Sequence, residues 1–334
     1  MKAWQIVSDG GIDALKLADV APSAPGPGEV RVRMKANSIN FRDLGTIRDP
    51  VARKLPYPRI PNSDGAGEVI AVGPGVAAFK PGDRVASCFF QRWIDGPCSI
   101  EAMNSALGGA IDGVLAEEVN LSADGVVPLP AHFSYAEGAT LPCAALTAWN
   151  AIVEVGRVKA GDPVLLLGTG GVSIFALQFA HMMGARTIIT SSSEEKLARA
   201  RALGASLTIN YRQKPDWENA VLEATDGKGV DLTVEVGGAG TLPRTISATR
   251  VAGTISLIGV LTGGQIDPAT VMRKSIRLQG IYVGSRRMFL DMNRAISLHG
   301  LKPVIDKTFG FADARAAYHA MQAAGHFGKL GIEM

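Results

Sequence analysis

Hydrophobic and polar residues alternate along the first third of the chain. Val30, Val32 and Met34 alternate with charged residues, and this period of two is typical of a strand with one buried face. Further strands are predicted at residues 65–73 and directly after the turn at residues 80–85, in both cases next to Pro and Gly residues. This part of the chain therefore predicts a small, irregular antiparallel barrel.

The pattern changes near residue 125. Ser134, followed by Glu137 three residues later, is a capping-box pattern and predicts the start of a helix that runs towards Gly156. Short apolar runs then alternate with helical segments. Strands are predicted at residues 164–167, 187–190, 207–210, 231–236 and 254–258, with helices between them around residues 172–183, 194–203 and 216–225. Such alternation is typical of a parallel sheet covered by helices on both faces.

The remaining residues are too few for a third core. They predict a strand at 278–283, helices at 288–299 and 311–324, and strands at 304–309 and 329–333. We expect the final segment to return to the barrel. The chain is thus expected to hold two domains, a barrel of residues 1–125 and 286–334 and a doubly wound α/β domain of residues 126–285.

Composition and charge narrow the class of protein. The 334 residues are 47% hydrophobic and 19% charged, which is enough apolar surface for a large core. The net charge of +3 is spread along the chain, and no basic block of the kind that binds nucleic acid is present. No apolar stretch has membrane-spanning length, and three widely spaced cysteines fit a reducing compartment. We therefore expect a cytoplasmic protein that binds neither nucleic acid nor membrane.

A glycine-rich turn follows the first strand of the α/β region. Gly168, Thr169, Gly170, Gly171 and Val172 lie between that strand and a helix, which is the context of the dinucleotide-binding fingerprint. A glycine here permits a sharp turn and a close approach of a pyrophosphate to the helix N-terminus. The third fingerprint position holds Ser173 in place of Gly or Ala. The alternative is a purely structural turn, which the repeated strand–helix alternation disfavours.

The end of the second strand indicates which dinucleotide binds. NAD-selective sites usually place an acidic residue there, whereas this chain has hydroxyl side chains, including Ser191 and Ser192. Hydroxyl groups can donate to a 2′-phosphate, and Lys196 adds a positive charge in the next helix. These features predict NADP(H). The alternatives are that this segment only caps the helix, or that Glu194 or Glu195 holds a ribose hydroxyl.

Several motifs occur in the order seen in the medium-chain dehydrogenase/reductase superfamily. They are Glu68-Val69, the turn at residues 82–85, the glycine loop and the sequence Ala-Leu-Gly-Ala at residues 202–205. The resemblance covers nearly the whole chain and implies a GroES-like β-barrel catalytic domain beside a Rossmann domain. Relatives often form a homodimer through the last strand of the nucleotide domain, here near residues 278–283.

The chain resembles the zinc-independent quinone oxidoreductase branch of that superfamily. The positions of the catalytic zinc ligands in the zinc enzymes hold Asn40, Ser63 and Cys143 here. Only one zinc ligand, Cys143, therefore remains where three are needed. Only Cys88 and Cys98 occupy the region of the structural zinc lobe. We therefore expect no metal site, and we interpret Cys143 as a packing residue and not as a nucleophile.

The resemblance also implies cofactor contacts beyond the glycine loop. Lys196 and Tyr211 match the Lys and Tyr that lie beside the 2′-phosphate in the quinone oxidoreductases. The remaining implied contacts, from both parts of the chain, are Asn40, Thr147, Gly237, Gly259, Val260, Tyr282, Val283, Phe327 and Lys329. Tyr282 and Val283 are expected near the nicotinamide, and Phe327 and Lys329 are expected to close over the cofactor.

Without a Lewis acid, hydride delivery to the β-carbon of an enone or quinone is easier than direct carbonyl reduction. Asn40 is a candidate donor to the charge that develops on the substrate. Asp43 and Asp64 are the acidic candidates for catalysis. Asp43 could instead be structural, and Asp64 could act as a proton relay or pair with Arg42 or another base. An aromatic substrate wall is predicted, with ordinary packing as its alternative, at Phe41, Phe89, Phe90 and Trp93.

Three functions therefore remain open. The first is an NADPH-dependent enone or quinone reductase acting on a small molecule. The second is a metal-free alcohol dehydrogenase that interconverts an alcohol and a ketone through a side-chain proton relay. The third is a non-catalytic NADPH-binding protein with a structural or RNA-binding role, against which the lack of a basic patch counts.

Overall fold

The computed structural model describes all residues, 1–334. They divide into two compact units. Unit 1 consists of Met1–Leu146 and Gly284–Met334, and unit 2 consists of Thr147–Val283. No helix in the structure is long and apolar enough to cross a membrane.

Unit 2 is a six-stranded parallel sheet with helices on both faces. The strands are β8 (Pro163–Leu166), β9 (Arg186–Ser191), β10 (Leu207–Asn210), β11 (Val230–Glu235), β12 (Thr249–Leu257) and β13 (Arg277–Gly280), in the spatial order β10-β9-β8-β11-β12-β13. This is the doubly wound order, and its direction reverses between β8 and β11. The Rossmann fold predicted from the sequence is confirmed.

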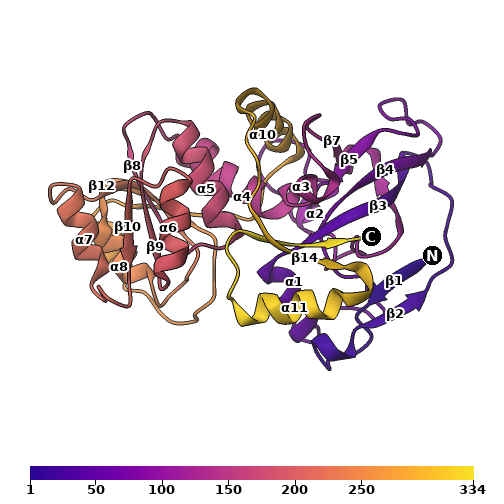
Figure 1. Ribbon diagram of the computed structural model, residues 1–334, viewed down its shortest axis with the longest axis horizontal. Coiled ribbons are helices and arrows are strands. Elements are labelled where there is room, and N and C mark those ends of the chain that lie inside the picture. Colours follow the sequence, from indigo (N-terminus) through magenta and orange to yellow (C-terminus); the bar gives the residue numbers. More distant parts are fainter. The chain divides into compact units, whose positions relative to one another are not determined.

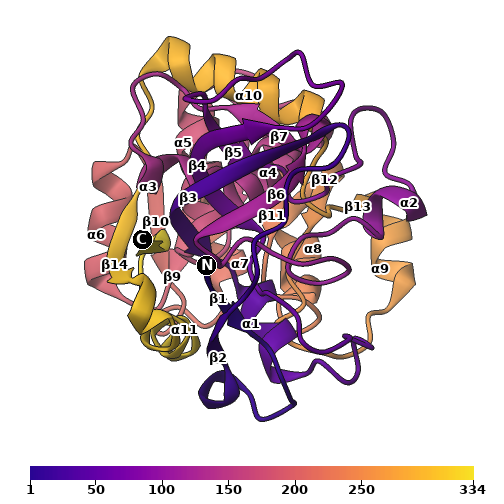
Figure 2. The ribbon, with the colours of Figure 1, turned by 90° about the vertical axis from the view of Figure 1, so that its right-hand side faces the viewer.

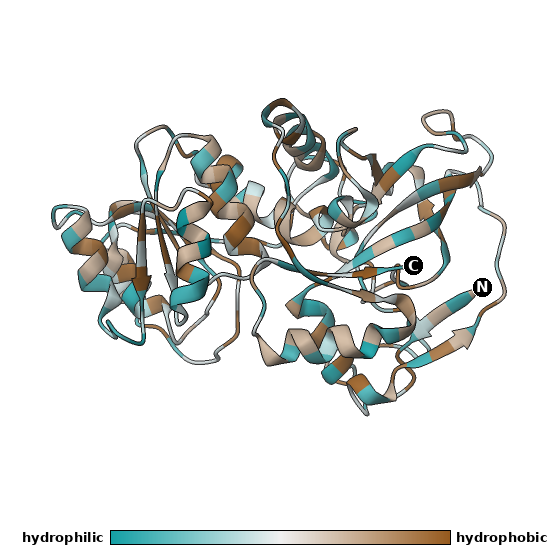
Figure 3. Cartoon of the chain, viewed as in Figure 1, coloured by the Kyte–Doolittle hydropathy of each residue, from teal (hydrophilic) through white to brown (hydrophobic).

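The helices of unit 2 follow from the same alternation. They are α5 (Gly171–Met182), α6 (Glu194–Ala202), α7 (Trp217–Ala224), α8 (Leu242–Ala248) and α9 (Pro268–Arg273). Figure 1 shows α5 and α6 on one face of the sheet and α7 and α8 on the other. The central strands are brown in Figure 3 because their residues are apolar, and Val164, Leu165 and Leu166 of β8 are fully buried. Burial on both faces explains why these strands appear in the sequence as continuous apolar runs.

Unit 1 contains the barrel. Its main sheet has the order β14-β15-β3-β4-β5-β7, with β6 also paired to β3 (Figure 2), and a separate hairpin joins β1 to β2. The strands are β1 (Lys2–Gln5), β2 (Lys16–Asp19), β3 (Glu29–Ile39), β4 (Asp64–Val72), β5 (Arg84–Ser87), β6 (Glu118–Ser122), β7 (Val126–Pro128), β14 (Ile305–Gly310) and β15 (Lys329–Glu333). Every pair is antiparallel except β14 with β15. The GroES-like barrel expected from the resemblance is confirmed.

The final segment of the chain completes this barrel, as expected. β15 pairs with β3, with Leu330 opposite Ile39. The three main helices of unit 1 are α1 (Phe41–Arg48), α10 (Arg286–His299) and α11 (Ala314–Ala323). On α11, Ala317 and Tyr318 are fully buried and belong to the main hydrophobic cluster of the unit. The amphipathic pattern predicted for this helix thus reflects its packing against the barrel.

The structure differs from the sequence-based expectation between residues 126 and 156. Residues 126–128 form β7 within the sheet of unit 1, and the division between the units follows Leu146. The capping box at Ser134 is present, since its hydroxyl accepts from the Glu137 N–H at 3.2 Å and Glu137 Oε2 accepts from the Ser134 N–H at 2.6 Å. The single long helix expected after it is wrong. Short segments replace it, namely α3 (Tyr135–Gly138), the π-helical η3 (Leu141–Ala145), α4 (Leu146–Trp149) and the π-helical η4 (Asn150–Val155).

Candidate functional site

The glycine loop joins β8 to α5 at the reversal point of the unit 2 sheet. Gly168 has a φ of 71°, in the left-handed region that only glycine adopts without strain. Gly170 caps α5 with a φ of −79°, and a Cβ placed on it would meet no protein atom within 4 Å. Ser173 is buried and donates to the Leu167 carbonyl at 2.6 Å, which explains how a serine fits the third fingerprint position. The loop therefore leaves open space in front of a helix N-terminus, as a pyrophosphate requires.

The hydroxyl-rich segment lies next to this loop at the end of β9. Gly168 N–H donates to Thr190 Oγ1 at 3.3 Å, and the Tyr211 N–H donates to the Ser191 carbonyl at 3.1 Å. Ser193 caps α6, because its Oγ accepts from the Lys196 N–H at 3.3 Å. The structure thus places the β9 end, the first turn of α6 and the residue after β10 together.

Glu194 and Glu195 are the acidic residues that could instead hold a ribose hydroxyl and so favour NAD. In the structure, Glu194 Oε1 accepts a hydrogen bond from Asn210 Nδ2 at 2.6 Å. Both residues line a pocket of about 440 Å³ beside the edge strand β10, whose lining includes neither Ser191 nor Ser192. Asn210, which lies opposite Ser191 in the neighbouring strand, therefore holds this carboxylate at the end of β10.

The remaining predicted cofactor contacts of unit 2 lie at the ends of its elements. Thr147 is buried in α4, Gly237 and Gly259 follow β11 and β12, and Val260 is strongly exposed. Tyr282 is half-exposed, whereas Val283 is buried with a φ of 58°.

Sequence reasoning missed the residue that supports Val283. A left-handed conformation is unusual for a β-branched residue and costs about 1–3 kcal/mol. The Val283 carbonyl accepts from Asn150 Nδ2 at 2.7 Å, and Asn150 is buried in the π-helical segment η4. The one signal for this contact in the sequence is Asn150 itself, a polar residue within an otherwise apolar segment.

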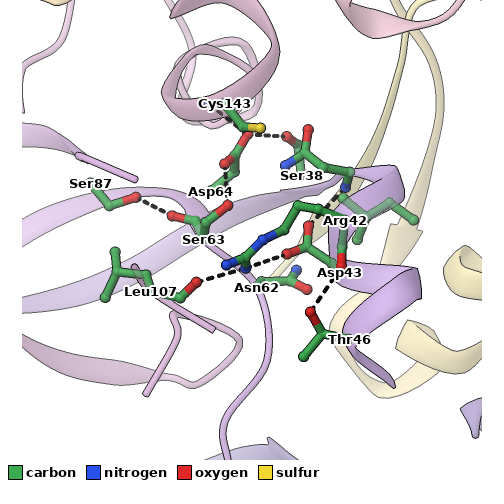
Figure 4. A network of polar contacts seen from close by, with 12 residues as sticks. Ser38, Arg42, Asp43, Thr46, Asn62, Ser63, Asp64, Ser87, Leu107 and Cys143 are labelled. Atoms are coloured by element: carbon green, nitrogen blue, oxygen red, sulfur yellow. Dashed lines mark hydrogen bonds and ion pairs between the residues drawn. The ribbon is translucent and has the colours of Figure 1, made fainter. Parts of the chain in front are cut away.

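Asp43 has a structural position in unit 1. Its Oδ2 accepts from the Asn40 backbone N–H at 2.9 Å, and its Oδ1 accepts from Arg42 Nη1 at 3.0 Å (Figure 4). Arg42 also donates to the Leu107 carbonyl at 2.7 Å. Both oxygens of Asp43 are engaged at the start of α1. Of the bases considered as partners of Asp64, Arg42 pairs with Asp43 instead, and the cation beside Asp64 is Lys329.

Asp64 lies at the start of β4 and is completely buried. It accepts from Ser63 Oγ at 2.7 Å, from the Cys143 N–H at 3.2 Å and from Ser38 Oγ at 3.4 Å (Figure 4). Burial raises the pKa of the Asp64 carboxyl, and the nearby ammonium of Lys329 opposes that rise.

Lys329 begins β15 and is only 3% exposed. Its Nζ donates to the Ile39 carbonyl at 2.9 Å and to Asn40 Oδ1 at 2.5 Å, and it lies 3.9 Å from Asp64 Oδ2. An ammonium group only donates, so the side-chain oxygen of Asn40 faces Lys329 and its NH₂ group is directed elsewhere. That NH₂ group is buried and makes no hydrogen bond of normal geometry, although it is close enough to lower the pKa of Asp64.

The aromatic candidates separate into two groups. Phe89, Phe90 and Trp93 are buried, with ring centroids 4.7 Å apart for Phe89–Phe90 and 5.7 Å for Phe90–Trp93. Phe41 on α1 is 54% exposed and Phe327 is 1% exposed. The three buried rings form a packed cluster, and the structure does not place Phe41 in it.

No three His, Cys, Asp or Glu side chains are grouped so that they could hold a metal ion. Cys143 remains at one of the positions that bind zinc in the zinc enzymes. Burial, followed by the charge of Asp64, raises the pKa of its thiol. A metal-binding cysteine must be a thiolate, which this environment opposes.

Two family models match the chain. Residues 26–131 match the alcohol dehydrogenase GroES-like domain, and residues 171–298 match the zinc-binding dehydrogenase family. A zinc-type alcohol dehydrogenase-like protein of Schizosaccharomyces pombe is 41% identical over 97% of this chain and 96% of its own. A quinone oxidoreductase of Rattus norvegicus is 28% identical over 99% of this chain and 97% of its own.

Solved structures agree with these relatives. An NAD-dependent alcohol dehydrogenase superposes with a TM-score of 0.92 at 35% identity, covering 100% of both chains. A mycobacterial protein complexed with NADPH superposes with a TM-score of 0.84 at 26% identity, also over 100% of both chains. The chain therefore belongs to the medium-chain dehydrogenase/reductase superfamily and is an oxidoreductase that uses a nicotinamide cofactor.

Proposed function

We propose that this protein is an NADPH-dependent reductase that transfers hydride to an enone or quinone-type substrate without zinc. The observation that carries the proposal is the identity of the side chains at the former zinc position. Asn40 and Ser63 are neutral, and they surround a buried carboxylate and ammonium, Asp64 and Lys329, where the zinc enzymes hold a metal. This arrangement offers hydrogen-bond donors and no Lewis acid.

The preference for NADP(H) rests on the environment of the 2′-phosphate. Ser191 and Ser192 are hydroxyl donors at the end of β9, and Lys196 lies in the first turn of α6. Asn210 restrains Glu194, which is the carboxylate nearest to this segment in the sequence. The hydroxyl groups and the ammonium can donate to a 2′-phosphate, and the hydrogen bond with Asn210 limits the freedom of Glu194 to bind a ribose hydroxyl instead.

The chain's own residues then have separate tasks. The loop from Gly168 to Gly170 and the N-terminus of α5 hold the pyrophosphate. The bound nicotinamide supplies the hydride. Asn40 is the candidate donor to the oxygen on which charge develops, and Lys329 fixes its side-chain oxygen. Because both oxygens of Asp43 and both oxygens of the buried Asp64 are engaged, we assign the final proton to water.

The test is NADPH oxidation across a panel of enones, quinones and ketones, with NADH and a chelator as controls. We expect turnover with enones or quinones that is stronger with NADPH and unchanged by chelation. Deuteride from labelled NADPH should appear at a carbon β to a carbonyl. Deuteride at a carbinol carbon would instead identify an alcohol dehydrogenase. Cofactor binding with no turnover on the whole panel would identify a binding protein, and loss of activity on chelation would contradict the metal-free reaction.

Lys196→Ala is expected to raise the KM for NADPH about tenfold and to change the KM for NADH much less, because one charge-assisted contact to the extra phosphate is lost. Initial rates with both cofactors measure this ratio. Lys228→Ala is the matched control. It removes an exposed lysine just before β11, at the amino ends of the strands and therefore at the end of the sheet opposite the glycine loop. Equal changes for the two cofactors would contradict the assigned role of Lys196.

A further inference from the structure

Glu235 is a buried carboxylate that the proposed chemistry does not use. It is the last residue of β11, and its side chain is fully enclosed. All its hydrogen-bond partners are uncharged and lie within the next ten residues of the chain. A buried carboxylate without a cation is costly, so its retention needs a reason.

The carboxylate binds the chain that follows it. Oε1 accepts from the Gly237 N–H at 2.6 Å, from the Gly238 N–H at 3.1 Å and from Thr241 Oγ1 at 2.7 Å. Oε2 accepts from Thr245 Oγ1 at 2.5 Å, inside α8. Backbone N–H groups only donate, so the position of Oε1 requires an acceptor. One oxygen thus fixes the loop after β11, and the other fixes the helix behind it.

The same loop is joined to the loop after β12. The Gly237 carbonyl accepts from the N–H and the Oγ1 of Thr262, both at 3.1 Å. Thr262 Oγ1 also accepts from the Gly240 N–H at 2.7 Å. Since β8, β11 and β12 are parallel, these two loops leave the sheet at the same edge as the glycine loop. In a doubly wound sheet that edge is where a dinucleotide binds.

We propose that Glu235 is a positioning residue for the cofactor. Through Oε1 it holds the backbone of residues 237–241 in the shape that the bound dinucleotide contacts, whereas its Oε2 binds Thr245 in α8 and contributes to the stability of the fold. This inference rests on the proposed function and extends it to a residue that touches neither cofactor nor substrate.

Two substitutions of similar size separate the acceptor from simple packing. Glu235→Leu removes the acceptor and leaves two backbone N–H groups unpaired, so we expect the Kd for NADPH to rise at least about tenfold. Glu235→Gln keeps an oxygen facing the glycines and turns its NH₂ group to Thr245, whose hydroxyl can accept. We expect this variant to bind NADPH within about threefold of the wild type.

A second pair of variants tests the two carboxylate oxygens of Glu235 separately. This test does not require Glu235→Leu to fold. Thr241→Val and Thr245→Val each remove one hydroxyl donor to the carboxylate. We expect Thr241→Val to raise the KM for NADPH about tenfold with a smaller change in kcat. Thr245→Val is expected to lower the thermal midpoint while leaving the KM for NADPH within about twofold.

Fluorescence titration with NADPH, thermal unfolding and initial rates on the full chain give these values. Equal effects of Thr241→Val and Thr245→Val on the KM for NADPH would overturn the proposal. So would wild-type affinity in folded Glu235→Leu. If the wild-type protein itself bound no NADP(H), the proposed function would fail first, so the two failures are distinguishable.

Discussion

Replacing Gly170 with valine is expected to weaken NADP(H) binding at least about a hundredfold while changing the free energy of unfolding by less than about 1 kcal/mol. The φ of −79° at this position suits any residue, and a Cβ there meets no protein atom within 4 Å. A side chain would therefore occupy only the space that a pyrophosphate needs. Fluorescence titration with NADPH and urea unfolding measure the two quantities.

Gly170→Ala is the graded control, because its single methyl group fills less of the same space. Its loss of affinity should lie between those of the wild type and Gly170→Val. Undiminished NADPH binding by Gly170→Val would show that the dinucleotide does not cross this turn. A large loss of stability would show instead that the space is not open in the folded protein.

Lys329→Met is expected to destabilise unit 1 by about 3 kcal/mol at neutral pH, because the charge of Asp64 loses its nearest cation within a buried site. The effect should depend on pH. The pKa of the Asp64 carboxyl is higher in the folded protein than its value of 3.8 in the unfolded chain. Its contribution to the free energy of unfolding is therefore fully present below pH 3.8 and is lost as the pH rises through the folded pKa. Removing Lys329 raises that pKa further, so the loss of stability relative to the wild type should grow as the pH rises above the raised pKa of Asp64 in the folded wild-type protein.

Urea unfolding at several pH values measures this dependence. The double variant Lys329→Met with Asp64→Asn carries neither charge of the Asp64–Lys329 pair and should recover much of the lost stability. A pH-independent loss in Lys329→Met would contradict the coupling between Lys329 and Asp64. A double variant no more stable than Lys329→Met would contradict it as well.

The fold was largely predictable because unit 2 has a strong local signal. Its strands are buried on both faces, so β10 was predicted with the bounds observed, Leu207–Asn210, and β8 within one residue. The segment after Ser134 was not predictable in the same way. Its apolar periodicity is helical, but residues 141–145 and 150–155 form π-helical turns that no residue type marks.

The candidate site was predictable only where a local motif carries it. The loop at Gly168 and the cap at Ser193 depend on neighbours in the sequence. Lys329, by contrast, reaches Asn40 across 289 positions of the chain, and only strand pairing reveals that contact. Glu235 falls within the strand predicted at residues 231–236, and the sequence does not mark its side chain, because its donors are glycine N–H groups and threonines that any turn contains.

The position of β15 also bears on the order in which the protein is made and folded. Unit 2 is one continuous stretch of chain, whereas β15 lies between β14 and β3 and joins the last residues to the first third of the sequence. During synthesis, the Rossmann sheet can close as soon as residue 283 has left the ribosome. The barrel must wait with an unpaired edge on β3 until residues 329–333 have left the ribosome, so it is the part of the nascent chain most exposed to aggregation.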